Sequence, residues 1–137
     1  MATDVERLLR GAIRKGTVSS VNPAAGTARV TFDDKGGAVS PELKLLHMFS
    51  GPNKDFWMPD VGEQVVCIFE TNDKNFSTGW ILGSYFTDRM PPQVQSADIR
   101  RVDFSDGTFF EYNRATSTLT VNCVGDVVVK GATINLN

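Results

Sequence analysis

Residues 116–137 read TSTLTVNCVGDVVVKGATINLN and alternate apolar with polar side chains, as a β-strand with one covered face does. Leu119 and Val121 share one parity, and Thr120 and Asn122 share the other. No segment with helical periodicity lies nearby, and a run of about twenty strand-forming residues cannot cover its own apolar face. We therefore expect these residues to be covered by something outside the chain.

Two further copies of the same chain are the expected cover. Beyond residue 98 only about 40 residues remain, a size at which a domain usually needs disulfides, a metal or oligomerisation. That stretch contains neither a cysteine pair nor metal-ligand spacing, so oligomerisation remains. In three copies wound about one axis, the apolar side chains would face the shared axis and the polar ones would face water. The side chains expected to form this trimer core are Leu119, Val121, Val127, Val129, Ile134 and Leu136.

Length and charge exclude several classes of protein. The 137 residues fit one domain, or one small domain plus an appendage. With 14 basic and 16 acidic residues the net charge is -2, which gives no long-range field toward phosphate backbones, so nucleic acid is not an expected partner. Neither a signal peptide nor a membrane-spanning run is present, which predicts assembly in a cytoplasm. Cys67 and Cys123 lie in separate apolar patterns, and we expect two buried thiols.

The chain opens with the signature of a short amphipathic helix, expected over residues 1–11. Thr3 followed three residues later by Glu6 has the form of a capping box. The apolar face of this helix either covers the core of its own domain or docks on a partner. Its members are Val5, Leu8, Leu9 and Ala12.

The sequence pattern of residues 12–88 is typical of an all-β barrel. The segment 16–34, GTVSSVNPAAGTARVTFDD, reads as a hairpin with strands at 17–21 and 28–32. Three more apolar runs follow, each bounded by Gly, Pro, Asn or Asp, at 44–51, 63–71 and 78–86. Five strands without an interior helix predict a partly open Greek-key barrel, the OB-fold. Residues 89–98 are the expected linker, because Pro91 and Pro92 cannot join a central strand.

Residues 104–129, FSDGTFFEYNRATSTLTVNCVGDVVV, resemble the start of the trimeric β-helix in the central spike of contractile injection machines. The family is the baseplate assembly protein V family of contractile-tailed phages and tailocins, which is related to type VI secretion spikes. Its pattern is a D-G-T turn, a strand ending in E-Y-[DN], and then L-T-V and G-D-V. The N-terminal part resembles the OB-fold collar of the same family. The fold expectation is thus all-β, with a short helix, a collar over 12–88 and a trimeric β-helix (β-prism) shaft over 99–137.

The resemblance implies a structural protein of the virion or tailocin baseplate. The family member is a homotrimeric needle beneath the tail tube, and it penetrates the target cell envelope when the sheath contracts. The OB-fold collars would then sit on a trimeric hub protein, with transient contact between the needle and the target membrane. No cofactor, nucleic acid or catalysis is part of this implication.

One departure from the family concerns the tip. Longer spikes of the family bind an iron ion through a His-x-His motif, whereas the only histidine here is His47. We therefore expect no tip metal, and instead a separate small conical protein that caps the trimer. The residues expected to bind this cap are Ile134, Asn135, Leu136 and Asn137.

Two groups of residues have an enzymatic interpretation and a plainer one. His47 lies three residues from Ser50 and could belong to a triad, but a half-buried strand histidine is the more ordinary interpretation. Acids at loop positions could form a glycan-cleaving pair, although acids beside Gly and Pro are usually solvated turn residues. These acids are Asp33, Asp34, Asp55 and Asp60. We expect no enzyme.

The remaining alternative is a trimeric OB-fold module that binds single-stranded nucleic acid or glycan. Aromatic side chains on an OB-fold loop are where such a protein stacks bases, and residues 56–58 read Phe-Trp-Met. A basic groove would also be required, and only Lys54 is nearby. The cluster is therefore expected to pack against the barrel or against the hub.

Overall fold

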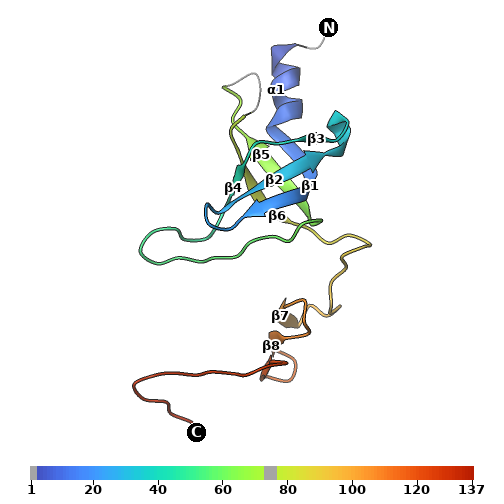
Figure 1. Ribbon diagram of the computed structural model, residues 1–137. Helices are drawn as coiled ribbons and strands as arrows, with labels where there is room; N and C mark the ends of the chain where they lie inside the picture. Colours follow the sequence, from blue (N-terminus) through green and yellow to red (C-terminus); the bar gives the residue numbers. More distant parts are fainter. Residues whose placement is uncertain (1–2, 73–76) are drawn as a thin grey trace. The chain divides into compact units, whose positions relative to one another are not determined.

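The computed structural model describes residues 3–72 and 77–137, which form two compact units, Met1–Pro91 and Pro92–Asn137 (Figure 1). The first unit carries a helix and a barrel, and the second carries a three-stranded sheet. No helix in the described part of the chain has the length and apolarity that a membrane crossing requires.

Helix α1 spans Asp4–Ala12 and begins at the predicted cap. Thr3 is extended, and its Oγ1 accepts a hydrogen bond from the Glu6 N–H at 3.1 Å. The predicted N-cap is therefore confirmed, although the helix ends one residue later than expected and Met1 lies outside the described residues. Asp4 also forms an exposed ion pair with Arg7 at 3.6 Å, which contributes little.

The apolar stripe of α1 is only partly covered. Leu8 packs against the barrel core and Gly11 is buried, so one side of the stripe is covered by the barrel of the same unit. Val5 and Leu9, on the adjoining side, are 64% and 72% exposed. The helix thus covers the core and still presents apolar surface.

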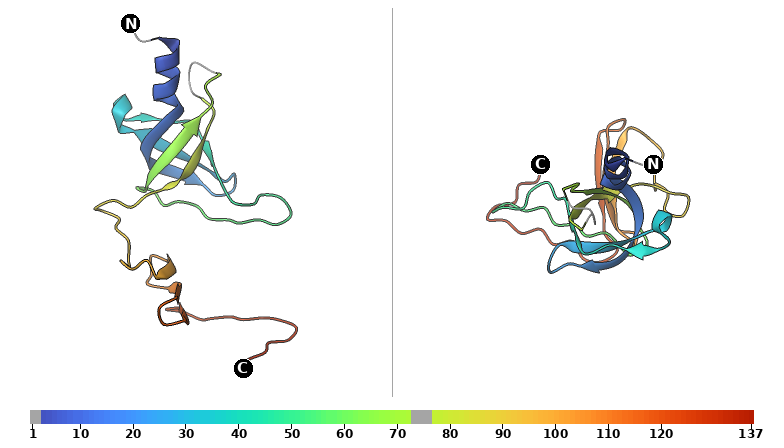
Figure 2. Two further views of the ribbon diagram at one scale, coloured as in Figure 1. Left: turned by 180° about the vertical axis from the view of Figure 1, so that it is seen from behind. Right: turned by 90° about the horizontal axis from the view of Figure 1, so that it is seen from above.

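Five strands close into a barrel of OB type (Figure 2). β1 pairs antiparallel with both β2 and β5, β5 pairs with β6, β6 pairs in parallel with β4, and β4 returns to β2. A two-residue strand, β3, extends the edge of β2. The bounds are β1 Ile13–Asn22, β2 Thr27–Phe32, β3 Ala38–Val39, β4 Leu43–Leu45, β5 Gln64–Phe69 and β6 Gly79–Ser84. The predicted barrel is confirmed.

The core of the barrel follows the alternation in the sequence. Ala28, Val30 and Phe32 are buried along β2, as their common parity predicted. Burial raises the pKa of the Cys67 thiol to about 11, so this predicted buried cysteine is confirmed and unreactive. The other core members are Val18, Leu43, Val65, Phe69 and Ile81.

The strand predicted at 44–51 was wrong beyond Leu45. β4 makes only two residue pairs with β2 and two with β6, and then the chain leaves the sheet. Residues 46–63 form a long loop that folds back on itself, where Ser50 and Lys54 make an isolated bridge. His47 is half-buried in this loop and not in a strand.

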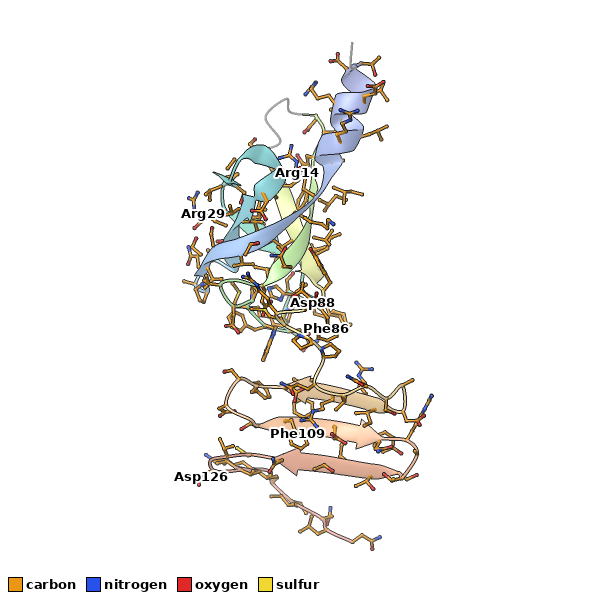
Figure 3. All side chains as sticks on the ribbon, turned by 90° about the vertical axis from the view of Figure 1, so that its right-hand side faces the viewer. Arg14, Arg29, Phe86, Asp88, Phe109 and Asp126 are labelled. Carbon is orange, nitrogen blue, oxygen red and sulfur yellow. The ribbon has the colours of Figure 1, made fainter. Side chains whose placement is uncertain are left out.

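The second unit is an antiparallel meander (Figure 3). Its strands are β7 Ile99–Asp103, β8 Phe109–Asn113 and β9 Thr118–Asn122. The predicted turns connect them. Asp106 Oδ1 accepts a hydrogen bond from the Thr108 N–H at 2.9 Å, which lowers the pKa of Asp106, and Gly107 has a φ of 96°. Asn113 Oδ1 accepts in the same way from the Ala115 N–H at 2.9 Å.

Residues 123–137, all described, contain no strand paired within the chain. Cys123 is half-buried, not buried as predicted, and its Sγ lies 3.5 Å from the carbonyl oxygen of Asp126. The alternation after β9 therefore has no partner strand within one copy of the chain.

Candidate functional site

One face of the β7–β8–β9 sheet carries five exposed apolar side chains and one exposed cation, Arg100, which lies opposite Tyr112. The register aligns Val102 with Phe110 and Phe110 with Val121, and it aligns Tyr112 with Leu119, so all five share a face. They are 37%, 46%, 62%, 46% and 70% exposed, in that order. Soluble monomers seldom leave such a contiguous set open to water. We call these five residues the apolar face.

The opposite face of the sheet is polar and internally satisfied. Arg101 Nε lies 2.8 Å from Asp103 Oδ1, and its Nη1 lies 2.7 Å from Glu111 Oε1. The same guanidinium lies over the Phe109 ring at 3.6 Å from the centroid. Hydrogen bonding to Asp103, and then to Glu111, raises the pKa of Arg101. Because these charges are already paired, the apolar face is the side of the sheet available for association.

Replacing Arg101 with alanine is expected to lower the melting temperature of the second unit by several degrees, since Asp103 and Glu111 would face each other unpaired. Arg114→Ala, which removes the more exposed pair with Asp98, is the matched control and should change it little. Thermal scans followed by circular dichroism measure both. Equal melting temperatures for the two variants would contradict the role given to Arg101.

The predicted trimer-core residues fall into two groups. Leu119 and Val121 lie on the apolar face, together with Val102, Phe110 and Tyr112, which sequence reasoning missed. The alternation in IRRVD and FFEYN was the signal that could have found them. The other four predicted residues lie in the unpaired segment 123–137 and are between 51% and 92% exposed: Val127, Val129, Ile134 and Leu136.

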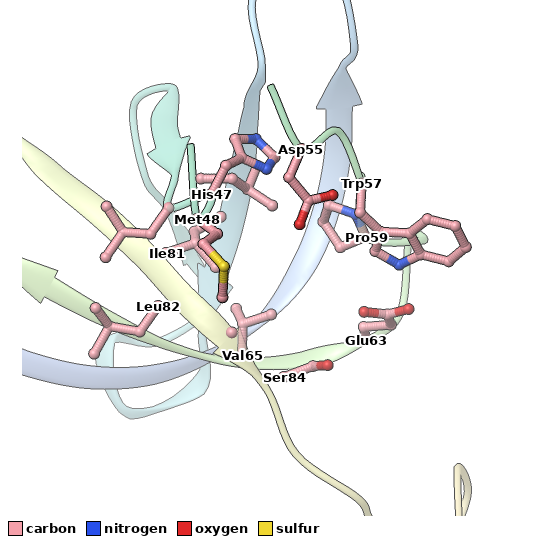
Figure 4. A pocket seen from close by; sticks show the side chains of 13 residues that line it. His47, Met48, Asp55, Trp57, Pro59, Glu63, Val65, Ile81, Leu82 and Ser84 are labelled. Carbon is pink, nitrogen blue, oxygen red and sulfur yellow. The ribbon is translucent and has the colours of Figure 1, made fainter. Parts of the chain in front are cut away.

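A hollow in the first unit lies between the long loop and the barrel (Figure 4). Val65, Ile81 and Leu82 of β5 and β6 line its strand side, and Met48 lies over them. On the loop side, Asp55, Trp57 and Glu63 line it. His47 also lines the hollow, and its ring stacks on Phe56 with centroids 6.4 Å apart.

The Phe-Trp-Met cluster at 56–58 does not pack fully onto the barrel. Phe56 and Trp57 are 63% and 56% exposed, and Met58 is half-buried. The hollow beside them is lined by two carboxylates and by neither lysine nor arginine. That charge is opposite to what a nucleic-acid groove requires.

Two of the candidate catalytic residues, His47 and Asp55, line the hollow, and the others lie elsewhere. Of the four acids, only Asp55 lines the hollow. Asp33 and Asp34 belong to the 3₁₀ turn η1 (Asp33–Lys35). Ser50 is exposed at the fold-back of the loop. Among the described residues, no three His, Cys, Asp or Glu side chains are grouped so that they could hold a metal ion.

Comparison with known proteins gives two matches. The family described as "type VI secretion system/phage-baseplate injector OB domain" matches residues 14–86, which contain almost the whole barrel. The spike protein of Escherichia phage P2 is 35% identical over 120 residues, equal to 87% of this chain and 54% of that protein. The chain thus spans about half the length of the curated relative it matches.

Proposed function

Since the chain belongs to the family of type VI secretion and phage-baseplate injector OB domains, we propose that it is the central spike of a contractile injection machine. In this proposal three copies form a needle that penetrates the target cell envelope when the sheath contracts. The protein acts mechanically and catalyses no reaction. The relative named as a spike protein supports this role, because the identity extends over 87% of the chain.

The observation that carries the proposal is the uncovered apolar face, together with the segment that follows it. A sheet with a polar, ion-paired side and an apolar, exposed side needs a partner for the second side. Residues 123–137 lack intrachain strand partners, yet they carry valine, isoleucine and leucine at high exposure. Two further copies supply both needs at once, because strands from different chains can then pair around a shared apolar axis.

The proposed division of labour follows the two units. The barrel forms a collar over residues 12–88 that attaches to a trimeric hub protein of the baseplate. Residues 89–98 link it to a shaft formed by residues 99–137, in which the chains wind as an intertwined β-helix. Ile134 and Leu136, with Asn135 and Asn137 beside them, offer exposed surface to a separate tip-capping protein.

Particle mass tests the proposal at low cost. Multi-angle light scattering of the full chain is expected to give about three times the chain mass of 15.0 kDa at micromolar concentration. Immunogold labelling of intact particles should place the chain at the lower end of the tail. A compact monomer of one chain mass would refute the needle. Salt-dependent retention on single-stranded DNA would instead favour a nucleic-acid-binding module, which the acidic hollow argues against.

A further inference from the structure

The hollow beneath the long loop has an aliphatic side and an acidic side. Its strand side is aliphatic, formed by Val65, Ile81 and Leu82, with the flexible Met48 thioether above them. Met48 itself is 77% exposed, so the space over this floor is open to solvent. An aliphatic chain of several methylene groups could lie along it.

The loop side of the same hollow is acidic. The carboxylates of Asp55 and Glu63 lie on either side of the Trp57 indole in the close view (Figure 4). Neither carboxylate belongs to an ion pair with any residue that the structure describes. Lysine and arginine are absent from the lining residues, so a cation entering the hollow would meet attraction and no repelling ammonium or guanidinium group.

We propose that this hollow binds a lysine or arginine side chain presented by a partner polypeptide. The aliphatic stem of that side chain lies against Met48 and Leu82, and its cationic end reaches Asp55 and Glu63 beside the indole. A peptide segment, rather than a small free cation, is the occupant because apolar surface continues beyond the hollow. Leu46, Phe49 and Phe56 on the same loop are 52%, 60% and 63% exposed, and a basic residue flanked by apolar residues would cover them.

This inference does not depend on the proposed trimeric needle. The hollow belongs to the first unit alone, and its chemistry holds whether the second unit forms a trimer or not. Failure of the test below would leave the proposed spike intact. A monomeric chain would likewise leave the hollow intact.

Methionine-methyl NMR on the full chain tests the hollow directly. The chain has four methionines, of which Met48 lines the hollow and Met90 does not, so Met90 serves as an internal reference. The probe is the capped tripeptide Leu-Lys-Leu, compared with peptides that carry norleucine or glutamate in place of lysine. The Met48 methyl signal, assigned with Met48→Leu, is expected to shift saturably with the lysine peptide at concentrations on the order of 1 mM. The norleucine peptide should bind at least about fivefold more weakly.

Variants of the two acids make the test specific. Asp55→Asn and Glu63→Gln are each expected to weaken the lysine peptide about three- to tenfold. Asp60→Asn, an exposed acid of the same loop outside the lining, is the matched control and should leave binding unchanged. Equal affinity for norleucine, or no saturable shift at Met48, would overturn the proposal. So would spermidine that shifts Met48 as strongly as the peptide, because the site would then take small cations.

Discussion

A chain carrying Val121→Asp is expected to be a monomer at concentrations at which we expect the unchanged chain to form the proposed trimer. Val121 lies in β9 at one end of a cross-strand row of the apolar face, opposite Phe110, which in turn lies opposite Val102. The Val121 side chain is 62% exposed in one chain, so an aspartate there should change the folding free energy of the single chain little. The proposed trimer would enclose this row and remove the new carboxylate from water.

The size of the effect follows from the number of copies. An uncompensated carboxylate in an apolar interior costs several kcal/mol even after relaxation. Threefold symmetry brings three of them together, and their mutual repulsion adds to the cost. A loss on the order of 10 kcal/mol per trimer removes the assembled state at micromolar concentration. No other single substitution in the second unit should have so large an effect for so small a change of shape.

Asn122→Asp is the matched control. It adds the same charge one residue along β9, on the opposite face of the sheet, and it is almost isosteric. Sedimentation velocity should show a trimer for the unchanged chain and for Asn122→Asp, and a monomer for Val121→Asp. A trimer that survives Val121→Asp would mean that the apolar face does not form the interface.

Sequence reasoning succeeded where a local pattern had a local structural cause. The parity of Ala28, Val30 and Phe32 placed them in the core because a barrel strand has one buried side. The spacing of Thr3 and Glu6 identified the start of α1 because an N-cap satisfies backbone donors within one turn. Both features need nothing from the rest of the fold.

It failed where apolar residues do not mark a buried strand. The run 44–51 was assigned as a strand on its composition, yet β4 ends at Leu45. Met48 and Phe49 are exposed on the loop, so their apolar character reflects a surface and not the barrel core. The hollow is lined by this loop together with β5 and β6. No spacing along the sequence predicts that Asp55 and Glu63 line the same hollow. Composition cannot distinguish these two origins of an apolar run.

For the apolar face of the second unit, sequence reasoning identified some residues and missed others. The register places Leu119 and Val121 on one face, as their shared parity predicted, whereas Phe110 and Tyr112 were overlooked beside Phe109. Because Phe109, Phe110 and Tyr112 lie so close together in the sequence, the alternation of apolar and polar residues in β8 is not obvious. The register resolves it, because Phe109 lies on the side of Arg101 while Phe110 lies on the apolar face. The partners of residues 123–137 remain a prediction, since within one chain these residues have no paired strand.

Replacing Gly16 with alanine is expected to disrupt the barrel more than most substitutions of one methyl group. Gly16 is buried in β1, where this strand pairs with β5 and then crosses onto β2. An added Cβ would overlap Val30 Cγ1 and lie 2.7 Å from the carbonyl oxygen of Thr31. The second of these neighbours is backbone, so no rotamer change can relieve the overlap.

We expect Gly16→Ala to cost about 3 kcal/mol or more, at the upper end for overpacking, because strain in the closed ring reaches both neighbouring strands. For a unit of about 90 residues this lowers the melting temperature by more than 10 °C. Gly83→Ala is the matched control, a strand glycine of β6 with nothing within 4 Å of an added Cβ, and it should melt within a few degrees of the unchanged chain. Calorimetry of the full chain separates the two outcomes. Equal melting temperatures would show that β1 and β2 can move apart at this crossing and make room for the added methyl group.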